Sequence, residues 1–95
     1  MRIVSRERLA KAEEAHKGSG SGKALAAWVR VAESPSWKHF PDVKRSWRSA
    51  DYVQPYVVFK IKGTDFRLTA TINYQMQTVA VERVQTHTEY TRKGP

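Results

Sequence analysis

The stretch YVVFKIKGTDFRLTATINY, residues 56–74, decides the fold of this chain. Apolar and polar side chains alternate through residues 56–62 and again through residues 66–74, which is the pattern of β-strands with one buried face. Between the two runs, Gly63 before Thr64 suits a two-residue hairpin connection. The stretch therefore predicts an antiparallel β-hairpin.

The register of this hairpin places two cations side by side. A turn at residues 62–65 pairs Ile61 with Phe66 on the buried face and Lys60 with Arg67 on the polar face. Two cations directly across a ladder repel each other. A bound anion would remove the repulsion, and an arginine fork beside a lysine suits a phosphate. The alternative is that both side chains extend into solvent.

A third strand is predicted over TVAVERVQTH, residues 78–87, with a less regular pattern. If the preceding loop spans residues 75–78, strict alternation along this strand would bury Arg83. One extra residue near Arg83, a β-bulge, returns the apolar residues to the core. The same bulge sets His87 opposite Arg67 on the polar face.

Such a row of side chains suits RNA cleavage in which the ribose 2′-OH attacks the adjacent phosphate. That reaction needs a base near neutral pH, charge stabilisation on the phosphate and an acid for the leaving oxygen. We expect Arg67, His87 and Tyr90 to be catalytic, since arginine clamps phosphate and tyrosine donates a proton or stacks on a base. A histidine that only completes a strand is the alternative. The cations expected to bind RNA phosphates are Lys60, Lys62, Arg83, Arg92 and Lys93.

The N-terminal half of the chain has helical signals. Helices are predicted over residues 6–16, with Ser5 as N-cap, and over residues 23–33, which Ser34 and Pro35 end. The glycine- and serine-rich residues 18–22 between them read as a flexible loop, natural or engineered. Further short elements are expected at Arg2 to Val4 (strand), near Pro41 (helix) and after Thr88 (a turn of helix).

The three tryptophans, Trp28, Trp37 and Trp47, allow two interpretations. Exposed together, they would form a platform on which RNA bases stack. Their helical spacing and apolar neighbours favour packing in the core instead.

Composition limits the chemistry and suggests the partner. The chain has no cysteine, and its three histidines are far apart in sequence, so we expect neither a metal nor a cofactor. There are 17 Lys and Arg residues against 9 Asp and Glu, a net charge of +8, which favours nucleic acid or an acidic protein as partner over an uninvolved basic surface. No apolar run is long enough for a membrane span or a signal peptide, so a cytoplasmic protein is expected.

The order of these segments resembles the HigB-type toxins of bacterial toxin–antitoxin modules, within the RelE/ParE superfamily. The resemblance covers residues 24–93 and rests on W…W…PDVKRSW…SAD, VVFKIKG, FRLTATINY and VQTHTEY in that order. It implies an mRNA interferase that cleaves translated messages on the ribosome without a metal. By position, Arg67, His87 and Tyr90 match the family's motif residues. Lys60 and Thr91 depart from the family's usual Asn and Asp.

The resemblance also implies a partner, an antitoxin of the HigA type with a helix-turn-helix DNA-binding domain, and a toxin that is monomeric when free. Two other functions remain open from the sequence: a toxin of the same fold that poisons DNA gyrase, as in the ParE branch, and a plain nucleic-acid-binding module. The predicted architecture is a single α+β domain over residues 1–95, with N-terminal helices packed on a small antiparallel sheet and a short C-terminal helical turn.

Overall fold

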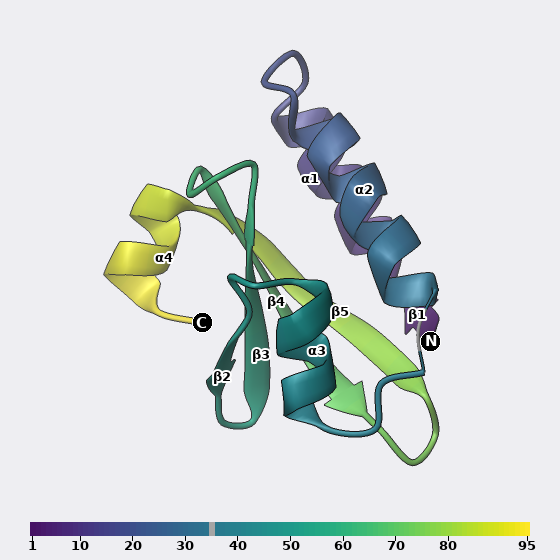
Figure 1. Cartoon of the computed structure of the whole chain (residues 1–95). Coiled ribbons are helices and arrows are strands. Elements are labelled where there is room, and N and C mark those ends of the chain that lie inside the picture. Colours follow the sequence, from purple (N-terminus) through teal and green to yellow (C-terminus); the bar gives the residue numbers. More distant parts are fainter. Residues whose placement is uncertain (35) are drawn as a thin grey trace.

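The computed structural model describes residues 1–34 and 36–95 and has the predicted α+β architecture (Figure 1). The predicted helix stop at Pro35 lies outside the described residues; α2 ends at Glu33. In chain order the elements are β1 (Arg2–Val4), α1 (Glu7–Ala15), α2 (Ser21–Glu33), α3 (Phe40–Ser46), β2 (Asp51–Val53), β3 (Tyr56–Ile61), β4 (Phe66–Asn73), β5 (Thr78–Thr86) and α4 (His87–Lys93).

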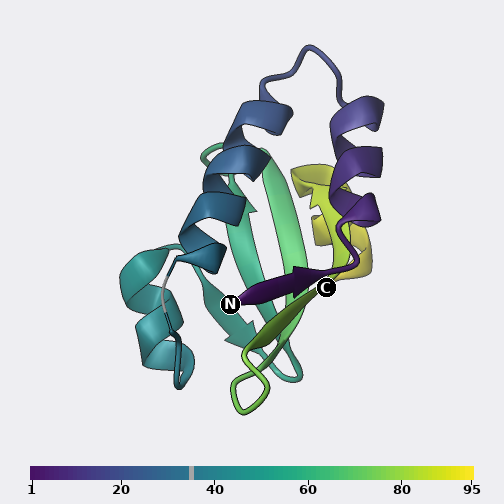
Figure 2. The same ribbon diagram turned by 90° about the vertical axis from the view of Figure 1, so that its right-hand side faces the viewer.

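The strands form one five-stranded sheet in the order β1-β5-β4-β3-β2. The predicted meander is its centre, β3 to β5. The sheet is mixed rather than antiparallel, because β1 pairs parallel with β5. The short β2 was not predicted from the sequence; it adds an antiparallel edge beside β3. The α1–α2 pair lies on one face of the sheet and α4 on the other (Figures 1 and 2).

The register predicted for the first hairpin is confirmed. Ile61 pairs with Phe66, and Lys60 pairs with Arg67. The connection is closed by the Asp65 N–H, which donates to the Lys62 carbonyl at 3.1 Å. Gly63 has a φ of 64°, a conformation that glycine adopts without steric cost.

The second hairpin has the predicted bulge but a different register. Ladder partners pass from Ala70 and Val81 directly to Thr69 and Arg83, so the extra residue is Glu82. The predicted loop over residues 75–78 is wrong: Asn73 pairs with Thr78, which leaves residues 74–77 as the loop.

Side chains of the loop explain this shift. The Asn73 carboxamide oxygen accepts from the Met76 N–H at 2.9 Å, and Gln77 Nε2 donates to the Tyr74 carbonyl at 2.8 Å. Both bonds form within the turn. They end β4 at Asn73, one residue before the end that the apolar pattern predicts. As a result Arg67 pairs with Gln85 rather than with His87, and His87 becomes the first residue of α4.

The core lies between the sheet and the N-terminal helices. Trp28 and Trp37 are buried and both contact the Phe59 ring, at centroid distances of 5.3 Å and 6.5 Å. The core interpretation of these two tryptophans is therefore confirmed. Trp47 is half-buried, and its indole N–H donates to the Lys60 carbonyl at 3.0 Å.

The start of α1 differs from the prediction. Ser5 is not the N-cap: its φ is 62°, and Arg6 is the residue that precedes the helix, without a side-chain cap. The backbone carbonyl of Ser5 instead accepts the Arg8 N–H at 3.1 Å. The parallel pairing of β1 places the chain on the sheet immediately before the helix, and the left-handed Ser5 makes the sharp turn between them.

The glycine- and serine-rich segment is shorter as a loop than predicted, because α2 begins at Ser21. Ser19 organises the turn: its hydroxyl donates to the His16 carbonyl at 2.6 Å and accepts the Ser21 N–H at 3.2 Å. At Gly22 a Cβ would lie 2.9 Å from a carboxylate oxygen of Glu13, so the Glu13 side chain of α1 reaches α2 at this glycine.

Candidate active site

Arg67 is the central residue of the candidate site and is 7% exposed. It lies in β4 on the face opposite the N-terminal helices, because its neighbours Phe66 and Leu68 belong to the core. Nη1 donates to the Thr64 carbonyl at 2.6 Å and to the Phe66 carbonyl at 3.4 Å. The β3–β4 turn therefore fixes one side of the guanidinium.

The other side of the guanidinium meets His87, with Arg67 Nη2 3.0 Å from His87 Nδ1. Guanidinium has donors and no acceptor, so Nδ1 must accept in this contact. His87 is then the neutral tautomer that carries its proton on Nε2. His87 is exposed, so this N–H is available to a substrate.

Tyr90 completes the predicted catalytic set. The Arg67 Cζ lies 5.5 Å from the centroid of its ring, within range of a cation–π interaction. His87 and Tyr90 are three residues apart on α4 and therefore share a face of the helix. Arg67, His87 and Tyr90 are thus brought together; we call them the Arg67 cluster.

A capping box fixes the start of α4 and hence the position of His87. The Thr86 hydroxyl accepts the Glu89 N–H at 3.2 Å, and the Glu89 carboxylate accepts the Thr86 N–H at 2.9 Å. The His87 N–H donates to the Asp65 carbonyl at 2.9 Å, which ties α4 to the β3–β4 turn. The backbone and side-chain hydrogen bonds from Thr86 lower the pKa of the Glu89 carboxyl.

The predicted phosphate-binding cations are distributed unequally around the Arg67 cluster. Lys60 is the ladder partner of Arg67, and Arg83 lies further along the same face with its guanidinium 5.6 Å from the Tyr56 ring centroid. Lys93 follows Tyr90 by three residues and shares its side of α4, whereas Arg92 faces away from that side.

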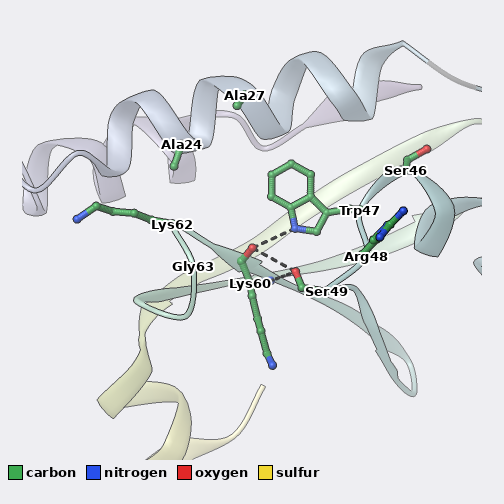
Figure 3. A pocket seen from close by; sticks show the side chains of 9 residues that line it. All are labelled: Ala24, Ala27, Ser46, Trp47, Arg48, Ser49, Lys60, Lys62 and Gly63. Atoms are coloured by element: carbon green, nitrogen blue, oxygen red, sulfur yellow. Dashed lines mark hydrogen bonds between the residues drawn. The ribbon is translucent and has the colours of Figure 1, made fainter.

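Lys62 does not join the cluster. Its ammonium lies 3.4 Å from a carboxylate oxygen of Asp65, and its stem passes within 3.1 Å of the Cβ position of Gly20 in the α1–α2 turn. Figure 3 shows that Lys60 of β3 and Lys62, in the turn that follows β3, extend in different directions.

A surface cavity of about 530 Å³ also lies elsewhere, between α2 and the edge of β3 (Figure 3). Trp47 and Ser49 line it and bind the backbone of Lys60: the indole N–H donates to the Lys60 carbonyl, and the Ser49 hydroxyl accepts the Lys60 N–H at 3.3 Å. These bonds satisfy the part of the β3 edge that the short β2 leaves unpaired. The groove thus protects a strand edge and is separate from the Arg67 cluster.

Sequence reasoning missed two contributors to the site. Gln85 is the true ladder partner of Arg67, and the Thr64 carbonyl holds the guanidinium. Had the loop after β4 been placed at residues 74–77, counting along the strands would have identified Gln85 as the partner of Arg67. A backbone carbonyl carries no signal in the residue pattern.

In residues 1–34 and 36–95, no three His, Asp or Glu side chains gather closely enough to hold a metal ion. No helix within the same described ranges is long and apolar enough to cross a membrane.

Comparison with known families identifies the chain. Residues 21–93 match the family model HigB_toxin, described as the RelE-like toxic component of a toxin-antitoxin system. No individual curated protein matches the chain significantly. The family match covers α2 through α4, and so includes every residue of the Arg67 cluster. The chain therefore belongs to the HigB toxin family, the RelE-like toxins of toxin–antitoxin systems, and has a cognate antitoxin as its partner.

Proposed function

We propose that this toxin is a metal-independent endoribonuclease that cleaves mRNA on translating ribosomes. The observation that carries the proposal is the contact between Arg67 Nη2 and His87 Nδ1 at 3.0 Å, with the Tyr90 ring beside the same guanidinium. A fixed cation, a histidine and a phenol are the groups that transfer of a phosphate ester to a neighbouring hydroxyl requires.

The reaction begins when the phosphate binds Arg67. The phosphate competes for Nη2, because charge-assisted bonds to phosphate are stronger than a bond to a neutral imidazole. This releases His87 Nδ1 as a proton acceptor, while the Nε2 proton stays available as a donor. The 2′ oxygen then attacks phosphorus, its proton passes to a base, and the bond to the 5′ oxygen breaks as an acid protonates that oxygen. The products are a 2′,3′-cyclic phosphate and a free 5′-OH.

Cations around the cluster would hold the flanking phosphates of the message. Lys60 and Arg83 lie on the same face of the sheet as Arg67. Lys93 adds a cation beside Tyr90, and Arg92 adds one on the far side of α4. Lys62 is left out of this group, because it points to the α1–α2 turn.

The remaining partners follow from family membership and charge. We propose that the cognate antitoxin is of the HigA type, with a helix-turn-helix domain, and presents an acidic surface to this chain of net charge +8. The free toxin is proposed to be a cytoplasmic monomer that assembles only through the antitoxin.

The deciding experiment is primer extension on a message incubated with the purified toxin, with and without ribosomes and with and without EDTA. New 5′ ends in the presence of the toxin support the proposal, and their persistence in EDTA on ribosome-free message supports metal independence. If they require ribosomes, the ribosome is part of the substrate. DNA-damage signalling without cut message would instead indicate a gyrase poison, and salt-sensitive RNA binding without any cut would indicate a binding module.

A further inference from the structure

Gln85 is a buried polar residue that the proposed mechanism does not use. It lies in β5 directly opposite Arg67 and is 8% exposed. Its carboxamide oxygen is buried, and no residue in the described ranges donates a hydrogen bond to it. Directly paired residues of an antiparallel ladder project to the same face, with Cβ atoms roughly 5 Å apart. An unpartnered acceptor therefore belongs to the side chain that neighbours Arg67 across the ladder, the residue whose guanidinium is assigned to the phosphate.

An acceptor in this state destabilises the fold. A buried polar group without a partner has lost its hydrogen bonds to water and gained none in return, whereas an apolar side chain of the same length would avoid that cost. Buried groups of this kind need an explanation, and a ligand that supplies the missing partner is one.

Thr69 provides a contrast on the same face of the sheet. It lies two positions from Arg67 in β4, and its hydroxyl is also buried without a partner among the described residues. Its exposure is 0%, and its ladder partners Val58 and Arg83 flank it on both sides. Thr69 is therefore a matched control residue. Its buried oxygen also has no hydrogen-bond partner in the described part of the chain, but a ligand cannot reach it.

We propose that Gln85 is a substrate-binding residue whose carboxamide oxygen accepts a hydrogen bond from the ribonucleotide held by Arg67. The inference rests on the proposed function. Arg67 and Lys60 supply only donors, whereas a nucleotide presents donors of its own: the ribose 2′-OH and the N–H groups of its base. Gln85 provides the acceptor for such a donor, and becomes accessible when the phosphate draws Arg67 away from His87.

The test replaces Gln85 by methionine, which has similar length and no strong acceptor. Gln85→Met is expected to retain or raise the melting temperature, because it removes the unpartnered oxygen. It is expected to lower the rate of message cleavage by roughly tenfold, which is the effect of losing one hydrogen bond to the substrate. Thr69→Val, the control, should also retain the melting temperature but cleave at the wild-type rate. Gln85→Leu gives a second variant in case methionine disturbs packing.

Two further measurements identify the donor. Cleavage is compared on four messages that differ only in the nucleotide preceding the cut, and binding is measured to an all-2′-deoxy oligonucleotide of the same sequence. A loss confined to one base that also appears in binding to the deoxy strand indicates a base N–H. A uniform loss that is absent from the deoxy strand indicates the 2′-OH.

Wild-type cleavage by a folded Gln85→Met or Gln85→Leu variant would overturn the inference. Equal losses in the Gln85 variants and in Thr69→Val would also overturn it, because the effect would then come from packing. These outcomes differ from failure of the proposed function, in which the wild-type toxin itself produces no cut. In that case RNA binding by the same variants still decides whether Gln85 contacts the nucleotide.

Discussion

Arg67 and His87 are not partners in the sheet, yet their side chains meet with Nη2 and Nδ1 3.0 Å apart. The contact forms because β5 ends at Thr86 and the chain turns into α4, which brings the imidazole back over the strand that carries Arg67. The site thus depends on a helix start as much as on the sheet register.

Removal of His87 from this contact should abolish cleavage while leaving the fold intact. His87→Gln is expected to lower the cleavage rate by about 10²–10⁴-fold, the contribution of a general acid or base. His87 is exposed and its side chain packs in no core cluster, so the melting temperature should stay near the wild-type value. Thr88→Ala, next to it and also exposed, is the control. Full toxicity of His87→Gln on expression would contradict the assignment.

Arg67→Lys separates the need for charge from the need for a planar fork. Lysine retains the positive charge but cannot bind the Thr64 carbonyl and His87 at the same time with the guanidinium geometry. We expect cleavage to fall at least about tenfold while RNA binding, measured by fluorescence anisotropy, changes little. A variant that cleaves at the wild-type rate would show that only the charge of residue 67 matters.

The capping box of α4 should control both stability and activity. Thr86→Ala removes the hydroxyl that accepts the Glu89 N–H and is expected to cost about 1 kcal/mol in the free energy of unfolding. Because α4 carries His87 and Tyr90, cleavage should fall more than this loss of stability explains. Urea unfolding and primer extension on the same preparation measure both. Thr91→Ala is the comparison, since its hydroxyl bonds within the helix, to the His87 carbonyl.

Acid should weaken the same helix start through Glu89. The folded-state pKa of this carboxyl is lowered by the hydrogen bonds from Thr86, so its contribution to stability is present above the unfolded pKa, ordinarily 4.5. The contribution disappears as the pH falls through the lowered folded-state pKa. Wild type should therefore be more stable than Glu89→Gln at neutral pH, and the difference should shrink in acid. A difference in melting temperature that is constant from pH 7 to about pH 2 would contradict this account.

Residues 56–74 show how far the sequence predicts this fold. Strict alternation and a turn of fixed length determined the register of β3 and β4, including the opposition of Lys60 and Arg67. The bulge at Glu82 was also predictable, because without it a charged residue would enter the core. The register between β4 and β5 was not predictable from the sequence. Local hydrogen bonds of Asn73 and Gln77 start the loop one residue early, and the pattern of apolar residues does not indicate such bonds. Because of that shift, Gln85 was not predicted as the partner of Arg67, and His87 lies in α4 rather than in the sheet.

The edge of β3 offers a last test, away from the Arg67 cluster. Trp47→Phe keeps most of the ring that lines the groove beside α2 but removes the indole N–H that satisfies the Lys60 carbonyl. We expect a loss of about 1 kcal/mol in the free energy of unfolding, the net value of one hydrogen bond, with the melting temperature lower and the cleavage rate on messages unchanged. Urea unfolding checks the first expectation and primer extension the second. If cleavage falls while stability is retained, the groove takes part in substrate binding, and the site extends around the β3 edge to the opposite face of the sheet.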